Sequence, residues 1–234
     1  MAIVEEWRRL DKHWRCAFRR AWAAYVAGTI PVGAVVVDLS GTIAAEGRNR
    51  IFNSEAPPTG QLARSWLAHA ELNAIAQIEA KWLTQSEGWA VYPTLEPCPM
   101  CAGATIVAFR GHITLGCASG DLGVGGLQVQ TETGSGSRRQ CQIEKLSGPL
   151  AVFAELLHAV YEVEARPTSR QALYYREHPW RSLIDSTGAV IARGRDQGES
   201  VAQVLASSWA EMEHAKVDSL VDPIPIKAQS LSEL

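Results

Sequence analysis

The chain has 234 residues, of which 47% are hydrophobic and 20% are charged, as in an ordinary globular protein. This length allows one large domain, or one domain of common size with an appendage. The formal net charge of −3 disfavours nucleic-acid binders, which usually show a basic surface. No apolar run reaches the length of a membrane-spanning helix, which speaks against a membrane protein.

The cysteines and the first residues bear on the cellular compartment. Five cysteines form an odd set, and two of them stand in a Cys-x-x-Cys pair. This usage favours reduced thiols over a disulfide framework. The first twenty residues mix acidic with basic side chains, so they do not resemble a signal peptide. We therefore expect a cytoplasmic protein.

The first predicted element is a helix over residues 3–27. Apolar side chains recur there every three or four residues, which indicates an amphipathic helix that ends at Gly28. Five arginines occupy its other positions: Arg8, Arg9, Arg15, Arg19 and Arg20. Because charged runs on helices usually face water, we interpret this side as solvent-exposed, with RNA binding as the alternative.

A hairpin and then an alternation of helices and strands follow. Residues 31–37 and 43–47 predict two strands joined by a turn, and residues 49–66 predict a loop, since they lack a period and contain Pro57-Pro58 and Gly60. The next elements are predicted as helix, strand, helix and strand, over residues 69–82, 89–95, 99–109 and 112–117. This order predicts a layered α/β domain in which helices cover the sheet.

The second half of the chain has a different pattern. Residues 119–137 are rich in Gly and Ser, and we expect them to be mobile. Beyond them the sequence predicts a helix, a second hairpin, another helix and an irregular tail at Pro223 and Pro225, the first three over residues 149–164, 182–194 and 199–217. We therefore divide the chain into a domain over residues 1–148 and a C-terminal extension of helices and a hairpin over residues 149–234, whose role the sequence does not indicate.

The two predicted hairpins resemble each other. Residues 35–49 and 182–196 align without gaps and share identical residues at five positions: Asp38/Asp185, Gly41/Gly188, Ala45/Ala192, Gly47/Gly194 and Arg48/Arg195. We interpret this echo as two hairpins with the same turn chemistry. The alternative is a decayed second copy of the domain, although no second Pro-Cys-x-x-Cys motif follows it.

A His-x-Glu motif at residues 69–71 and a Pro-Cys-x-x-Cys motif at residues 97–101 are the most informative features. One His and two Cys can hold a zinc ion and leave its fourth position for water, as a catalytic site requires. Cys98 and Cys101 lie one helical turn apart at a predicted helix N-terminus, which favours their thiolate forms. We predict one zinc ion per chain, held by His69, Cys98 and Cys101, in the spacing typical of zinc deaminases.

Glu71 is poorly placed to be a fourth ligand and well placed to move protons. Replacing an amino group on an aromatic ring requires a strong nucleophile, which zinc supplies by lowering the pKa of water from about 16 towards about 7. Glu71 would take a proton from the water, protonate a ring nitrogen, and deliver a proton to departing ammonia.

A closed structural zinc clamp is the alternative to a catalytic site. Such a clamp normally recruits a fourth Cys or His. Cys16, Cys117 and Cys141 are available, but none of them belongs to a ligand-spaced pair, and we expect them to be small core residues.

Four segments resemble the cytidine deaminase-like zinc hydrolases, and within them the bacterial tRNA adenosine deaminase and guanine deaminase branches. They cover residues 31–37, 47–50, 69–71 and 94–104, and the likeness runs over residues 21–126, nearly half of the chain. The resemblance implies a three-layer α/β/α fold with a central mixed five-stranded sheet, here followed by a C-terminal α+β extension. It also implies a homodimer with an interface near the pocket.

The resemblance further implies substrate contacts from Asn49, Ala70, Leu95 and Pro97. An Asn amide both donates and accepts hydrogen bonds, which suits the edge of a heteroaromatic base. The alternative for Asn49 is a turn or cap residue. The loop over residues 51–68 is longer than in the tRNA-editing enzymes, and we interpret its Trp66 as a packing residue, with a wall of the pocket as the alternative.

These patterns predict a zinc-dependent hydrolytic deaminase that releases ammonia from a small nucleobase or nucleoside, of purine-like chemistry. One alternative is a tRNA adenosine-to-inosine deaminase. The motifs favour it, whereas the net charge disfavours it, as does the stretch from Asp196 onward, where acidic residues outnumber basic ones by seven to two. A second alternative is a degenerate deaminase domain that serves as a zinc-bound binding or regulatory module, against which the intact Glu71 speaks.

Overall fold

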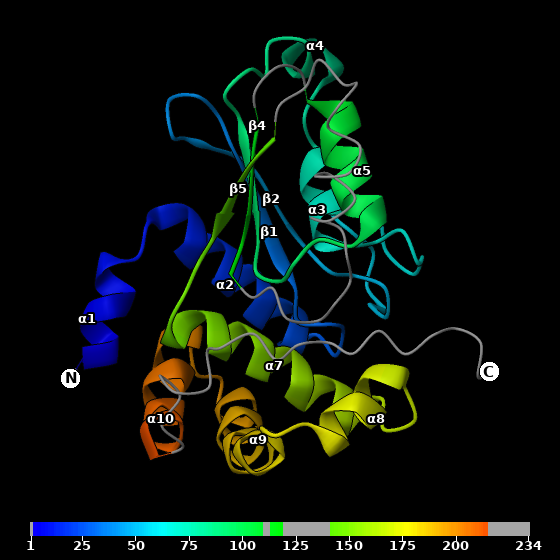
Figure 1. Cartoon of the computed structure of the whole chain (residues 1–234). Coiled ribbons are helices and arrows are strands. Elements are labelled where there is room, and N and C mark those ends of the chain that lie inside the picture. Colours follow the sequence, from blue (N-terminus) through cyan, green and yellow to red (C-terminus); the bar gives the residue numbers. More distant parts are fainter. Residues whose placement is uncertain (1, 110–112, 119–140, 215–234) are drawn as a thin grey trace, which may run out of the picture.

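The computed structural model describes residues 2–109, 113–118 and 141–214 (Figure 1). Three sequence predictions fall outside these ranges. They are the Gly- and Ser-rich segment 119–137, the end of the last helix at residues 215–217, and the tail with Pro223 and Pro225. In the part of the chain that is described, no helix has the length and apolar character needed to cross a membrane.

A five-stranded mixed sheet lies at the centre of the first half, as predicted. Its strands are β1 (Gly33–Val37), β2 (Ile43–Arg48), β3 (Ala90–Pro93), β4 (Ile113–Cys117) and β5 (Cys141–Lys145), in the order β2-β1-β3-β4-β5. Strand β1 runs antiparallel to both β2 and β3, whereas β3, β4 and β5 are parallel to one another. The strand that the residue pattern did not single out is β5, at the edge of the sheet.

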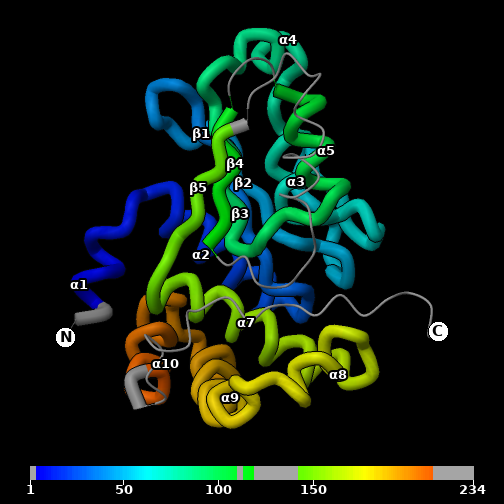
Figure 2. The backbone as a smooth tube through the Cα atoms, viewed as in Figure 1, coloured from blue at the N-terminus to red at the C-terminus, as the bar shows by residue number. Residues whose placement is uncertain are grey.

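Helices cover both faces of the sheet (Figure 1). The first half contributes α1 (Ala2–Arg9), α2 (Lys12–Val26), α3 (Ala70–Ile75), α4 (Ala80–Leu83) and α5 (Pro99–Ala108). The second half contributes α7 (Pro149–Ala165), α8 (Arg170–Glu177), α9 (Arg181–Asp196) and α10 (Val201–His214). Helices α3 and α5 lie on one side of the sheet, and Figure 2 shows α7 to α10 gathered beyond one of its ends, where α7 contacts α2.

Strand β1 shows why the sheet is covered on both faces. All five of its residues are buried, and alternate side chains point to opposite sides of a strand. Val35 and Val37 join the apolar cluster that contains side chains of α2 and α7. Ala34 and Val36 join the cluster that contains side chains of α3 and α5. The three-layer α/β/α arrangement therefore follows from one strand that is apolar on both faces.

Two predicted helices of the first half are shorter than expected. The helix over residues 3–27 is two helices, because the chain turns at Leu10, which is buried, and Asp11, which is extended, with φ of −57° and ψ of 150°. Helix α1 then packs against α10, a contact that the local pattern does not show. The end of α2 at Gly28, where φ is +72°, agrees with the prediction. The helix over residues 69–82 is also two elements, α3 and the single-turn α4.

The predicted hairpin over residues 182–194 is wrong, because these residues form the helix α9. Its buried residues recur at helical spacing: Leu183, Ile184, Thr187, Gly188, Ile191 and Gly194. This face packs against α7 and α10. The extension is therefore helical over residues 149–214, not α+β, and the sequence echo aligns a true hairpin with a helix. The sequence similarity between the two segments therefore reflects neither two hairpins of the same kind nor a second copy of the deaminase-like domain.

The extension and the first half share one apolar cluster. Phe18 of α2 lies 6.3 Å from Phe153 of α7 between ring centroids. Hydrogen bonds also join the two regions, from Trp22 Nε1 to the carbonyl of Glu199 at 2.8 Å and from Tyr25 to Glu164 at 3.1 Å. The division of the chain into two domains between residues 148 and 149 stays a prediction. The contacts above show that the helical extension packs directly against the first half.

Candidate metal centre and adjoining cavity

Two helix N-termini bring the three predicted zinc ligands together. His69 is the N-cap of α3, Cys98 is the N-cap of α5, and Cys101 lies one turn into α5. His69 Nδ1 is 3.8 Å from Cys98 Sγ and 3.5 Å from Cys101 Sγ. The donor atoms of all three side chains lie within 4.8 Å of one another. Residues that are some thirty positions apart in sequence thus form one compact donor group.

The spacing of these donors fits a zinc ion. Tetrahedral zinc has Zn–S bonds of about 2.3 Å and Zn–N bonds of about 2.0 Å, which place a sulfur and a nitrogen about 3.5 Å apart. The two observed sulfur–nitrogen distances, 3.5 Å and 3.8 Å, lie close to that value. The donor set of one imidazole and two thiols is also one that zinc prefers. The group can therefore hold one zinc ion.

The two thiols share a proton unequally. A hydrogen bond from the Cys101 thiol, helped by His69, lowers the pKa of Cys98 to about 4. The same contact, together with burial, raises the pKa of Cys101 well above its usual range. Contact with Cys98 raises the pKa of His69. One thiolate is thus available before any metal arrives, and metal binding would displace the proton from the other thiol.

Glu71 lies inside this group rather than beside it at the surface. Its side chain is buried, with 3% of the residue exposed, and it contacts the Cys101 thiol. Burial raises the pKa of Glu71 above the usual range for a carboxyl. The structure thus places Glu71 next to the three donors, in surroundings that make it a better proton carrier than an exposed glutamate.

Gly47 allows helix α3 to approach the sheet closely enough to carry these residues. A Cβ atom at Gly47 would lie 2.3 Å from the carbonyl oxygen of Ala70 and 2.5 Å from the amide nitrogen of Ala74. No side chain fits at such distances without moving the backbone of α3. Because His69 caps this helix and Glu71 lies in its first turn, the glycine in β2 determines where both functional side chains sit.

The long loop after β2 is held by a buried amide that the sequence analysis missed. Asn73 of α3 accepts a hydrogen bond from the amide of Leu62 at 2.7 Å. It donates to the carbonyl oxygens of Arg48 at 3.0 Å and Leu62 at 3.2 Å. Trp66 of the same loop is 68% exposed and contacts the ring of Phe52, so its interpretation as a packing residue of the core is wrong.

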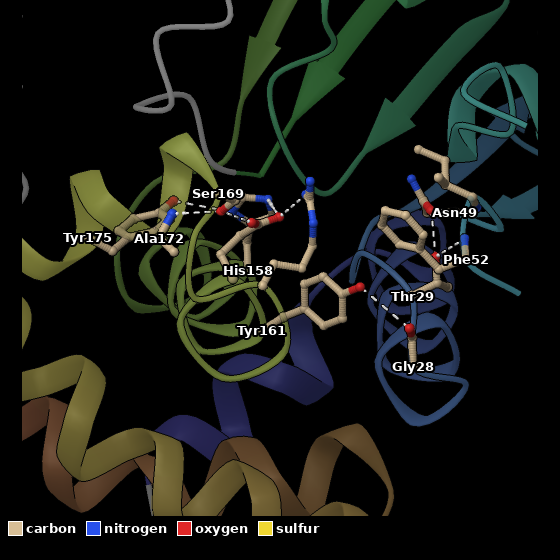
Figure 3. A network of polar contacts seen from close by, with 12 residues as sticks. Gly28, Thr29, Asn49, Phe52, His158, Tyr161, Ser169, Ala172 and Tyr175 are labelled. Carbon is tan, nitrogen blue, oxygen red and sulfur yellow. Dashed lines mark hydrogen bonds and ion pairs between the residues drawn. The ribbon is translucent and has the colours of Figure 1, made fainter.

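The predicted substrate contacts are only partly brought together. Asn49 is buried and lines a cavity that His69, Glu71 and Cys98 also line. Its Oδ1 accepts hydrogen bonds from Thr29 Oγ1 at 2.8 Å and from the amide of Ile51 at 3.0 Å (Figure 3). Leu95 lines the same cavity, whereas Ala70 and Pro97 are buried and do not.

The cavity has a volume of about 160 Å³ and a second wall that the sequence analysis did not anticipate. This wall comes from the C-terminal extension and consists of four polar side chains: His158, Glu162, Arg166 and Gln171. The first three are spaced four residues apart, so they share one face of α7 and its C-terminal end. Polar residues at that spacing in a largely apolar helix were the signal that could have found them.

Comparison with known proteins agrees with the motif at the donor group. Residues 8–117 match the family model described as "Cytidine and deoxycytidylate deaminase zinc-binding region". The tRNA(Ile)-lysidine synthase of Deinococcus radiodurans is 38% identical over 95 residues, which cover 40% of this chain and 15% of that protein. The tRNA-specific adenosine deaminase of Bacillus subtilis is 34% identical over 101 residues, which cover 43% of this chain and 56% of that protein.

A third relative has a name that indicates a free base as its substrate. The guanine deaminase of Bacillus subtilis is 39% identical over 75 residues, which cover 32% of this chain and 42% of that protein. The chain covers between 15% and 56% of the length of these three relatives. Helices α7 to α10 lie beyond the residues that match the family model.

Proposed function

Residues 8–117 of this chain belong to the cytidine and deoxycytidylate deaminase zinc-binding family, and on that premise we propose that the protein is a hydrolytic deaminase. It replaces an exocyclic amino group of a purine-like nucleobase or nucleoside with oxygen and releases ammonia. One observation carries the proposal: His69, Cys98 and Cys101 form a group of three donors with the Glu71 carboxylate in contact. A structural clamp would normally add a fourth Cys or His, and within the described residues this group has three members.

Glu71 moves the protons of the reaction. The zinc ion held by the three donors would lower the pKa of water from about 16 to about 7 and so supply a nucleophile at neutral pH. Glu71 accepts one proton from the water and passes it to a ring nitrogen, so that the neighbouring carbon becomes electrophilic and is attacked by the water oxygen. Glu71 then takes the second proton from that oxygen and delivers it to the amino group, which leaves as ammonia. Burial raises the pKa of Glu71, which makes its protonated form easier to reach and so suits a group that both takes and returns a proton.

Asn49 orients the base by donating a hydrogen bond. The Ile51 amide can only donate, so the oxygen of the Asn49 side chain must face it, and the Nδ2 end is the one left for a ligand. Leu95 supplies an apolar contact in the same cavity. Contacts from Ala70 and Pro97, the homodimer and the cytoplasmic location remain predictions.

The size of the cavity supports a small substrate. Its volume of about 160 Å³ is close to the roughly 150 Å³ that encloses one benzene ring in an engineered protein cavity. A flat base without its ribose and phosphate suits that space best. We therefore place a free base before a nucleoside in the order of candidate substrates.

An ammonia-release screen of the zinc-loaded protein tests this function. The screen covers guanine, adenine, cytosine, their nucleosides and nucleotides, and related triazines and pterins. We expect release from a free base, and we expect Glu71→Gln to lower the rate by about 10²- to 10⁴-fold, the usual contribution of general acid–base catalysis, with unchanged zinc content. The matched control is Glu79→Gln, an exposed residue paired with Lys81, which should leave the rate unchanged. Ammonia release at the unmutated rate by Glu71→Gln would show that the proton-carrier role is wrong.

A tRNA adenosine deaminase is the second candidate, because two of the relatives named above act on tRNA by their names. The small cavity and the formal net charge of −3 speak against it. Binding of tRNA measured over a salt series separates the two candidates. Tight binding that weakens steeply with salt would favour the tRNA substrate over the free base.

A further inference from the structure

The wall of the cavity formed by α7 lies outside the region that matches the family model. His158 and Glu162 stand one turn apart on this helix and are nearly inaccessible, with 6% and 1% of each residue exposed. Both nonetheless line the cavity together with Glu71 and Cys98. Burying a polar side chain is unfavourable unless it is hydrogen-bonded, so two such groups facing one cavity need an explanation.

A chain of hydrogen bonds fixes which nitrogen of His158 carries the proton. The Tyr175 hydroxyl donates to Glu155 Oε1 at 2.8 Å. A phenol has one hydrogen, so the Tyr175 oxygen can only accept from His158 Nδ1, which lies 3.3 Å away (Figure 3). The Nδ1 atom is therefore the protonated one.

The other nitrogen of His158 is consequently an acceptor. Burial, and after it the nearby Arg166, lowers the pKa of His158 to about 4, so the ring is neutral near pH 7. With its single proton on Nδ1, the ring has a lone pair on Nε2. Nε2 lies 3.8 Å from Glu162 Oε1, beyond hydrogen-bond distance, as expected for two acceptors.

Glu162 is held rigidly with acceptor capacity to spare. Ser169 Oγ donates to its Oε2 at 2.6 Å, and Arg166 Nη1 donates to its Oε1 at 2.8 Å. A carboxylate offers about four lone-pair positions, of which these two donors use two. The α7 wall thus presents two neighbouring hydrogen-bond acceptors, His158 Nε2 and the Glu162 carboxylate. Arg166 and Ser169 hold the carboxylate in place.

We propose that His158 and Glu162 determine substrate specificity by accepting hydrogen bonds from N–H or NH₂ groups on the edge of the base that faces α7. The substrate is then a heterocycle with a second donor group besides the amino group that reacts. A ring with a bare C–H at that edge would leave the buried His158 Nε2 lone pair without a donor and is disfavoured, whereas Glu162 would keep its bonds from Ser169 and Arg166. Tyr175 is a positioning residue, because it acts only through the tautomer of His158. This inference rests on the proposed deaminase function.

The test compares two bases that differ in one amino group, 2,6-diaminopurine and adenine. The readouts are the ratio of kcat/KM for the two bases and the ratio of their Kd values, measured by calorimetry on the zinc-loaded protein. The unmutated protein should prefer 2,6-diaminopurine by about tenfold or more. His158→Phe, which keeps a flat ring but removes the acceptor, should bring both ratios near one. His158→Gln, whose amide oxygen can take the place of Nε2, should restore part of the preference.

Two tyrosine variants separate positioning from a general loss of packing. Tyr175→Phe removes the hydroxyl that fixes the His158 tautomer and should reduce the preference severalfold. Tyr161→Phe on α7 removes a hydroxyl that donates to the carbonyl of Gly28 at 3.4 Å and does not line the cavity, so it should leave the ratio unchanged.

Three outcomes would overturn the inference. They are a preference of the unmutated protein for adenine, an unchanged ratio in His158→Phe, and an absence of binding to either base. In each case ammonia release from another substrate in the screen would leave the deaminase function standing. Conversely, a preference in Kd that depends on His158, without ammonia release from any base, would support the recognition edge and contradict the deaminase.

Discussion

The first half of this chain, with strands β1 to β5, and the helical extension α7 to α10 contribute to the same cavity in different ways. In the first half, two short motifs each lie at a helix N-terminus, so the local sequence already states which donors meet. In the extension, the four-residue spacing of His158 and Glu162 marks only a polar face of α7, and the packing of α7 against the first half brings that face to the cavity. The metal-binding chemistry can thus be predicted from two short motifs, whereas the proposed specificity depends on how two regions of the chain pack together.

The largest effect is expected from removing a ligand. Cys101→Ala leaves two donors, so zinc affinity should fall by more than about 100-fold, beyond the range typical of changes outside the ligand shell. Chelator competition measures this affinity. Cys16→Ala is the control, since the Cys16 thiol contacts Glu46 and lies outside the donor group. Stoichiometric zinc at unmutated affinity in Cys101→Ala would contradict the three-donor site.

Two glycine-to-alanine substitutions, one in each region, compare how much room the fold leaves for a Cβ atom. Gly47→Ala pushes α3 away from β2 and should cost about 1–3 kcal/mol of unfolding free energy, because a Cβ there would meet backbone atoms at 2.3 Å and 2.5 Å. Gly188→Ala in α9 meets Val160 Cγ2 at 3.6 Å, an ordinary contact, and should gain about 0.5–1 kcal/mol, since alanine favours helices over glycine. Urea unfolding of the metal-free variants measures both changes in unfolding free energy. If both substitutions stabilised the protein, or both destabilised it, the predicted difference between the two regions would be wrong.

The buried imidazole of the extension makes stability depend on pH. The pKa of His158 is about 4 in the folded protein and near 6.5 when unfolded, so the unfolded chain binds more protons between these values. The stability is complete above about pH 6.5 and falls as the pH drops towards 4, by up to about 3 kcal/mol. Urea unfolding at pH 7 and pH 4.5 should show a smaller difference for His158→Phe than for the unmutated protein. Identical differences would mean that His158 is not buried in its neutral form.

The smallest effect is expected at the exposed end of the loop. Trp66→Ala removes a ring that is 68% exposed and does not line the cavity. The unfolding free energy should change by no more than about 0.5 kcal/mol, as is usual for surface positions. The kcat/KM for the preferred base should also remain unchanged. A loss of activity would show that Trp66 closes over the bound substrate after all.

Particular residues show how far sequence patterns could lead. The apolar run in β1 and the Gly28 stop after α2 were read correctly, because burial on both faces of a strand and a left-handed glycine have direct local signatures. The sequence wrongly predicts a hairpin at α9 because Asp185 and Gly188 resemble turn residues of the first hairpin. The helical spacing of buried side chains in α9 was present in the sequence but was outweighed by that local similarity.

The donor chemistry of this protein follows from its local sequence: two motifs identify His69, Cys98 and Cys101, because each motif places its ligands at the start of a helix. What faces these donors follows from the packing of distant segments. Gly47 decides how closely α3 approaches the sheet, and α7 brings His158 and Glu162 to the cavity from more than fifty residues further along the chain. Contacts at that sequence separation arise from the burial of apolar faces against each other, which a local pattern does not record.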